Sequence, residues 1–137
     1  MFILRYRLRS EGHFWPAQQE DCREAMAEIR KRAAQCESHT DRVGVIGFSA
    51  GGHLASVAAT MFDKDVQPNF QMLIYAATNV ETPSWNPWKA RFGYPGREAN
   101  TFDKVTPKTP PLFAAVSKQD EVTTYAENTC SSIRGAM

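Results

Sequence analysis

One serine in this 137-residue chain lies in a setting that suits nucleophilic chemistry. Ser49 stands in the middle of Gly47-Phe48-Ser49-Ala50-Gly51, which fits the pattern G-x-S-x-G. Glycines two residues before and after a serine allow a tight backbone turn, so that the hydroxyl is pushed out at the end of a strand in a strained conformation. We therefore predict a nucleophile elbow at Ser49, with Gly47 and Gly51 as the residues that permit the turn.

The elements that must position Ser49 lie on either side of the motif. The run Val43–Phe48 is short, apolar and β-branched, as is typical of a parallel strand covered on both faces. A helix reaching about Phe62 is expected after the serine, and small residues would let it pack closely on the sheet. These residues are Gly51, Gly52, Ala55, Ser56, Ala58 and Ala59. Five-residue matches occur by accident, so this context is what favours an elbow over a glycine-rich turn with an idle serine.

A serine hydroxyl becomes a good nucleophile when a histidine removes its proton and a carboxylate orients that histidine. Asp120 is the candidate carboxylate, because it follows a third buried-type strand, Leu112–Val116, and would share the carboxyl edge of the sheet with Ser49. The backbone N–H of Ala50, at the start of a helix, would help to stabilise the negative charge of a tetrahedral intermediate.

The histidine of such a triad should follow the acid, yet His13, His39 and His53 all precede Asp120. His53 lies four residues beyond Ser49 on the same predicted helix, but no carboxylate is placed to orient it, so a packing role is favoured. His13, in a loop after a predicted strand, is a weaker candidate. The sequence therefore predicts a site that lacks its general base.

Further elements complete the expected fold. Phe2–Leu8 alternates as a strand with one partly wet face does, and Phe70–Ala76 is the next strand after the helix that follows Ser49. A helix after Pro16 is predicted to bury one face, which comprises Cys22, Ala25, Met26, Ile29 and Ala33. Alternating strands and helices predict an α/β fold with a mostly parallel, doubly wound sheet of about four strands.

Two segments are harder to interpret. Residues 78–111 form a long irregular stretch rich in prolines and aromatic side chains. Long loops in compact domains are usually functional, which favours a lid or pocket wall, although aromatics that merely pack the insertion onto the body explain it equally well. A further helix is expected to begin at Val122 and to reach Ser132.

Composition narrows the function classes. A formal charge of +1 argues against nucleic acid or an anionic membrane as the main partner. No apolar run approaches the ~20 residues of a membrane span, and no signal peptide is visible, so a cytoplasmic location is the default expectation. Cys22, Cys36 and Cys130 are expected to be free thiols. Neither metal-ligand spacing nor a phosphate-binding glycine loop is present, so no metal or cofactor is expected.

The motifs occur in an order similar to that of a known family. Phe2–Leu8, the elbow with its helix start (residues 47–55), Leu73-Ile74-Tyr75 and Val105–Phe113 together resemble the bacterial α/β-hydrolase esterases related to acetyl esterases and carbohydrate (xylan) acetylesterases. The resemblance covers nearly the whole chain. It implies a single, incomplete α/β-hydrolase domain over residues 1–137 that acts on a small ester, for which an acetylated carbohydrate is one candidate.

The same resemblance implies roles for individual residues. Ser49 would be the nucleophile and Asp120 the triad acid, with Glu121 as a second candidate for the acid. Two segments typical of the family are absent, a His-Gly-Gly loop that supplies oxyanion donors and a Gly-Gly-His-Gly segment that carries the base. The isolated chain is therefore expected to be inactive or weakly active.

The strand that precedes the family's His-Gly-Gly loop would lie between Phe2–Leu8 and Val43–Phe48. Its absence should leave a gap in the sheet or force these two segments together. Two other functions stay open. One is a non-catalytic module that binds a partner or self-associates through exposed sheet edges, and the other is a serine peptidase of the same fold.

Overall fold

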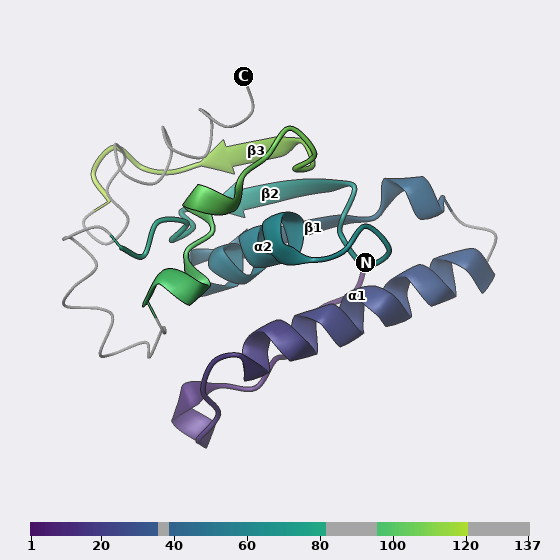
Figure 1. Ribbon diagram of the computed structural model, residues 1–137, viewed down its shortest axis with the longest axis horizontal. Coiled ribbons are helices and arrows are strands. Elements are labelled where there is room, and N and C mark those ends of the chain that lie inside the picture. The colour runs from purple at the N-terminus through teal and green to yellow at the C-terminus, as the bar shows by residue number, and fades with distance from the viewer. Residues whose placement is uncertain (36–38, 82–95, 121–137) are drawn as a thin grey trace.

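A parallel sheet runs through the centre of the protein, as Figure 1 shows for the computed structural model, which describes residues 1–35, 39–81 and 96–120. Strands β1 (Gly44–Phe48), β2 (Phe70–Ile74) and β3 (Leu112–Ala115) lie in that order, and both pairs are parallel. Their carboxyl ends therefore share one edge of the sheet. The predicted α/β fold with a parallel sheet is confirmed.

Helix α2 (Ser49–Met61) connects β1 to β2 and packs against both strands. Every residue from Gly52 to Ala59 is buried, because the small side chains of this stretch let the helix lie close to the sheet. The helix ends one residue before Phe62, as the sequence predicts.

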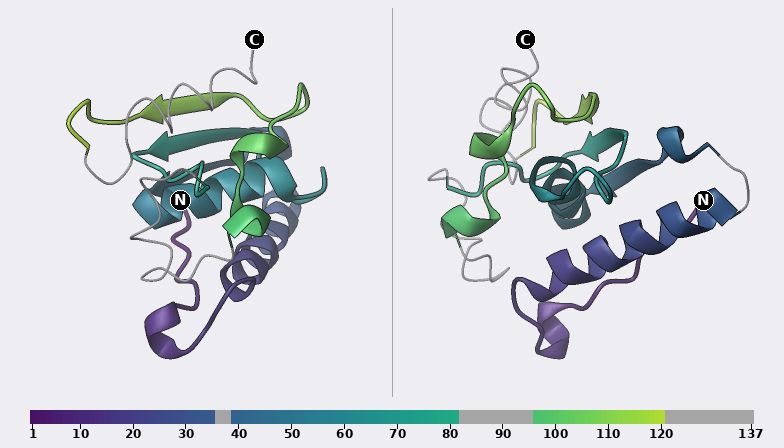
Figure 2. Two further views of the ribbon diagram at one scale, coloured as in Figure 1. Left: turned by 60° about the vertical axis from the view of Figure 1, so that its left-hand side comes forward. Right: turned by 45° about the vertical axis from the view of Figure 1, so that its right-hand side comes forward.

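Helix α1 (Ala17–Gln35) lies on the outer side of α2, away from the sheet (Figures 1 and 2). Its predicted apolar face is confirmed, since Cys22 and Met26 are buried in one cluster with Leu54, Val57, Ala58 and Phe62. A short 3₁₀ helix, η2 (Thr40–Arg42), leads into β1.

The strand predicted at Phe2–Leu8 is wrong. This segment runs beside α1, ahead of the 3₁₀ helix η1 (Arg9–Glu11), and is part of no sheet. Its backbone is held by a side chain instead, because the Arg7 N–H donates to Asp21 Oδ2 at 2.7 Å and Arg7 Nε donates to Asp21 Oδ1 at 2.8 Å. Among the described residues β1 pairs with β2 alone, so Phe2–Leu8 neither pairs with β1 nor flanks a gap in the sheet. The described sheet has three strands instead of four.

The face of the sheet opposite α2 carries several large apolar side chains. The large side chains there are exposed by about half, with Ile46 at 56%, Phe48 at 53%, Phe70 at 42% and Phe113 at 55%. Within residues 1–35, 39–81 and 96–120, no helix covers this face, so the doubly wound arrangement stays a prediction. The helix predicted from Val122 lies outside the described residues.

Part of the long irregular stretch packs on α2. The 3₁₀ helices η4 (Gly96–Ala99) and η5 (Phe102–Lys104) flank Thr101, whose hydroxyl accepts a hydrogen bond from Ser56 Oγ at 2.8 Å and donates to the Thr78 carbonyl at 3.0 Å. Packing onto the body thus explains this portion. Residues 82–95 lie outside the described residues, so the lid or pocket wall stays a prediction.

Candidate active site

Ser49 occupies a strained turn at the carboxyl end of β1. Its φ of 50° lies in the left-handed region, while Phe48 before it is extended with φ −118°. A residue other than glycine holds such a conformation at a cost of about 1–3 kcal/mol, and these residues cluster at functional sites. Ser49 is also exposed. The sharp strand-to-helix turn predicted from the sequence is therefore present, with the serine at its tip.

The glycines of the elbow differ in what they permit. A Cβ on Gly47 would lie 2.1 Å from the carbonyl oxygen of Gly51, so the first turn of α2 passes directly over this residue. A Cβ on Gly52 would lie 2.6 Å from the Cβ of Ala76. At Gly51 the nearest atom would be the Tyr6 hydroxyl at 4.0 Å, which is an ordinary contact. A side chain would therefore be obstructed at Gly47 and at Gly52, whereas Gly51 has room for one.

The N-terminus of α2 points its backbone donors toward the elbow. The first N–H groups of a helix have no partner within the helix, and the residue before Ser49 makes no side-chain cap. Ala50 supplies one of these N–H groups, and the helix dipole adds a partial positive charge there. The geometry is suited to stabilising an oxyanion that forms at Ser49.

Asp120 lies in the loop that leaves the carboxyl end of β3, where its N–H donates to the Ser117 carbonyl at 3.2 Å and the residue is half-buried. Since β2 separates β1 from β3, the ends of the outer strands are two strand spacings apart, or about 10 Å. An imidazole with a hydrogen bond of about 3 Å at each nitrogen bridges a gap of similar size. Glu121, the alternative acid, lies outside the described residues.

None of the histidine positions matches that of a base held between Ser49 and Asp120. His53 is 1% exposed, and its Nε2 lies 2.6 Å from the Ala99 carbonyl oxygen. Its ring also packs against Trp15, with centroids 5.8 Å apart, and burial lowers the pKa of His53 to about 4. This environment agrees with the packing role expected from the sequence.

The other two histidines lie on loops outside the elbow. His39 precedes β1 and so lies at the opposite edge of the sheet from Ser49, with Nδ1 4.0 Å from Asp41 Oδ1. The backbone of His13 donates to the Leu8 carbonyl and accepts from Gln18 Nε2, which holds it in the loop before α1.

Tyr75 lies at the same edge of the sheet as Ser49, in a conformation that the sequence did not reveal. It follows β2 directly and has a φ of 41°, so a second strained residue lies at the edge that carries Ser49. Its N–H donates to the Ala115 carbonyl at 2.7 Å, and its ring centroid lies 6.1 Å from that of Phe48. The tyrosine side chain gives no signal of this conformation, because bulky residues seldom adopt it.

Charged and sulfur ligands do not gather in the part of the chain that the structure describes. No three His, Cys, Asp or Glu side chains there are grouped to hold a metal ion. Among the described helices, none combines the length and the apolar character that crossing a bilayer requires.

Comparison with known proteins gives consistent matches. The model of the family BD-FAE matches residues 1–82. An acetylxylan esterase of Xylanibacter ruminicola is 30% identical over 124 residues, which cover 90% of this chain and 24% of that protein. Esterase LipQ of Mycobacterium tuberculosis is 28% identical over 138 aligned residues, covering 83% of this chain and 33% of that protein. The chain thus spans about a quarter to a third of these curated relatives.

Solved structures share the fold. The acetyl ester-xyloside bifunctional hydrolase from Caldicellulosiruptor lactoaceticus superposes with a TM-score of 0.76 at 25% identity, covering 94% of this chain and 53% of that one. A sugar hydrolase from Lactococcus lactis superposes with a TM-score of 0.78 at 24% identity, again over 94% of this chain and 53% of the other.

Proposed function

This chain belongs to the BD-FAE family, and from that premise we propose that it carries the nucleophile and the acid of a serine carboxylic-ester hydrolase. Ser49 is the nucleophile, Asp120 is the acid that would orient a histidine, and the Ala50 N–H contributes to the oxyanion hole. The observation that carries the proposal is the strained, exposed serine at the start of α2, with φ 50°.

The substrate class follows from the relatives. One matched protein is named an acetylxylan esterase and another an acetyl ester-xyloside bifunctional hydrolase, so a small acetyl ester, including one on a carbohydrate, is the substrate we propose. Attack by the Ser49 oxygen on the ester carbonyl would form a tetrahedral intermediate and then an acetyl-serine, with release of the alcohol.

Proton transfer is the weak step in this chain. His53 is buried against Trp15 and the Ala99 carbonyl, and the remaining histidines lie on other loops. Removal of the base from a serine triad lowers the rate by several orders of magnitude. In the chain by itself, Ser49 should therefore be acetylated slowly by an ester, and an added small base should speed this acetylation.

A chemical-rescue experiment tests this assignment. The chain is incubated with p-nitrophenyl acetate, with and without imidazole, and acetylated peptides are identified by mass spectrometry. We expect acetylation of Ser49 that rises with imidazole and is lost in Ser49→Ala. The matched control is Ser117→Ala, because Ser117 is an exposed serine just beyond β3 at the same edge of the sheet. Acetylation at Ser49 no greater than at other exposed serines would refute the assignment.

A second function is supported by a separate observation. Ile46, Phe48 and Phe113 expose more than half of their surface on one sheet face, and among the described residues β1 pairs with β2 alone. Exposed apolar faces and open strand edges favour association. A self-associating module without catalysis is therefore the alternative.

The two functions differ in solution behaviour. If the chain is a self-associating module, light scattering after size exclusion should show a discrete oligomer. Ile46→Lys should dissociate this oligomer, whereas Ala27→Lys, on an exposed position of α1, should leave it intact. A monomer at all concentrations would remove the alternative and leave the esterase assignment untouched.

A further inference from the structure

Two aromatic residues lie next to the proposed nucleophile, Phe48 directly before it and Tyr75 at the end of the neighbouring strand. We propose that Phe48 and Tyr75, called the aromatic pair below, form the binding site for a sugar ring in the alcohol part of the ester. This inference rests on the proposed function. An acetyl group is small, so a ring in an acetyl ester substrate belongs to the alcohol.

The strand register places Tyr75 beside Ser49. Phe48 and Ile74 are Cα partners in the parallel pair of β1 and β2, and neighbouring strands lie about 4.8 Å apart. Ser49 and Tyr75 are the residues that follow this pair. Among the described residues other than glycine, only these two have a positive φ, of 50° and 41°. Both backbones thus leave the sheet at the same level in a costly conformation, and such residues cluster at binding and catalytic sites.

The rings of the aromatic pair are open to solvent. Phe48 is 53% exposed and Tyr75 is 41% exposed. Their centroids lie 6.1 Å apart and their planes are inclined by 58°, so the two rings contact each other without covering each other's faces. The Tyr75 N–H donates to the Ala115 carbonyl at 2.7 Å, which fixes the backbone that carries this ring. The aromatic pair is therefore a preformed apolar surface at the edge of the sheet that carries Ser49.

The chemistry of an exposed tyrosine ring suits a sugar. The C–H groups on one face of a pyranose carry small positive partial charges, whereas the face of an aromatic ring is negative, so the two faces attract each other when they stack. The Tyr75 hydroxyl can in addition donate or accept a hydrogen bond with a sugar hydroxyl. An alcohol held on this surface would lie beside Ser49, with its acetyl group within reach of the serine oxygen.

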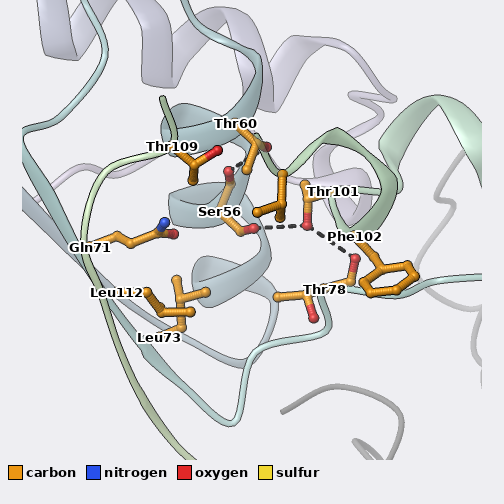
Figure 3. A pocket seen from close by; sticks show the side chains of 10 residues that line it. Ser56, Thr60, Gln71, Leu73, Thr78, Thr101, Phe102, Thr109 and Leu112 are labelled. Carbon is orange, nitrogen blue, oxygen red and sulfur yellow. Dashed lines mark hydrogen bonds between the residues drawn. The ribbon is translucent and has the colours of Figure 1, made fainter. Parts of the chain in front are cut away.

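The cavity drawn in Figure 3 is not an alternative place for the sugar. It lies beside the second half of α2, with Ser56 and Thr60 in its wall. Its volume is about 20 Å³, and a single water molecule already takes up about 10–15 Å³ of such space. A sugar ring is many times larger than a water molecule. The exposed aromatic pair, in contrast, has no walls that limit the size of the alcohol.

Sugar binding can be measured without turnover. Xylotriose is titrated into the chain, and the Kd is obtained from the shifts of aromatic ring resonances in NMR spectra. Tyr75→Gly removes the ring and suits the φ of 41° without strain, and we expect it to raise the Kd by about 3- to 10-fold. Tyr75→Phe keeps the ring and should retain most of the affinity. The matched control is Phe14→Ala, which removes an aromatic ring that is 59% exposed in the loop before α1 and should leave the Kd unchanged.

A rate comparison separates the sugar site from the nucleophile. Acetylation of Ser49 in the presence of imidazole is measured with acetylated xylotriose and with vinyl acetate, whose alcohol part has no ring. The ratio of the first rate to the second should fall by about 3- to 10-fold in Tyr75→Gly. An unchanged ratio, an unchanged Kd in Tyr75→Gly, or no binding of xylotriose to the unaltered chain overturns the sugar site.

Two further outcomes are decisive. Binding of xylotriose that depends on Tyr75, without acetylation of Ser49, would support the sugar site and refute the proposed nucleophile instead. If Tyr75→Gly fails to fold, the unaltered chain decides the matter. Xylotriose should then shift the ring resonances of Tyr75, and shifts confined to other aromatic residues would overturn the proposal.

Discussion

The two glycines of the G-x-S-x-G motif should respond in opposite ways to alanine. In Gly47→Ala the new Cβ would lie 2.1 Å from the Gly51 carbonyl oxygen and 2.5 Å from its carbonyl carbon. Both are backbone atoms of the first turn of α2, so no side chain can rotate away to make room. In Gly51→Ala the new Cβ meets only the Tyr6 hydroxyl, at 4.0 Å.

The magnitudes follow from these distances. An ordinary contact needs at least 3.4 Å, so Gly47→Ala forces the helix away from β1 by more than an ångström. Overpacking of this kind costs about 1–3 kcal/mol or more, and a backbone obstacle places the cost at the upper end. Gly51→Ala removes a glycine from a helix, which stabilises by about 0.5–1 kcal/mol. The free energies of unfolding of the two variants should therefore differ by roughly 4 kcal/mol.

Urea denaturation followed by far-ultraviolet circular dichroism measures this difference directly. Both variants change one hydrogen to a methyl group within the same motif, so each serves as the control for the other. If Gly51→Ala destabilises the chain as much as Gly47→Ala does, the close passage of α2 over Gly47 is not what makes glycine necessary, and the reasoning fails.

Three further predictions concern titration, reactivity and an ion pair. Burial lowers the pKa of His53 to about 4, so between pH 6.5 and 4 the unfolded chain binds a proton at this residue that the folded chain does not. The free energy of unfolding should therefore fall by roughly 3 kcal/mol as the pH drops from 6.5 to 4. Urea titrations at several pH values should show that His53→Gln loses this part of the pH dependence. Burial raises the pKa of the Cys22 thiol to about 12, so peptide mapping should find Cys22 alkylated by iodoacetamide only after unfolding, and rapid native labelling would contradict its burial. Arg7→Lys should lower the urea midpoint of unfolding, because lysine cannot reproduce the fork that Arg7 presents to Asp21, whereas the exposed Arg5→Lys should leave the midpoint unchanged.

The parts of the fold that local sequence determines were predictable. The small residues after Ser49 predict a helix packed closely on the sheet, and the apolar spacing around Cys22 and Met26 identifies the buried face of α1. Phe2–Leu8 shows where this approach stops. Alternation along a segment indicates extended backbone, but a strand also needs a neighbour, and here the polar contacts go to Asp21, fourteen positions away from Arg7.

The site was predictable in outline and not in its tertiary details. The motif places Ser49 at a strained turn after β1, and this geometry is present. Which glycine is sterically required depends on the path of α2 over Gly47, which the five-residue pattern does not contain. The positive φ of Tyr75 likewise has no signature in its side chain.

The attachment of η4 and η5 to α2 has a consequence for how specificity can diverge. Thr101 donates hydrogen bonds to the Thr78 carbonyl from both its N–H and its hydroxyl, and the Ala99 carbonyl oxygen is hydrogen-bonded to His53 Nε2. On α2 the contacts are made by His53 to Ala99 and by Ser56 to Thr101, about 6 Å and 10 Å along the helix axis from Ser49 at 1.5 Å per residue. We therefore expect insertions or replacements between Thr78 and Thr101 to leave the turn at Ser49 undisturbed. Relatives can therefore differ in the segment between Thr78 and Thr101 while they keep the same turn around the proposed nucleophile, Ser49.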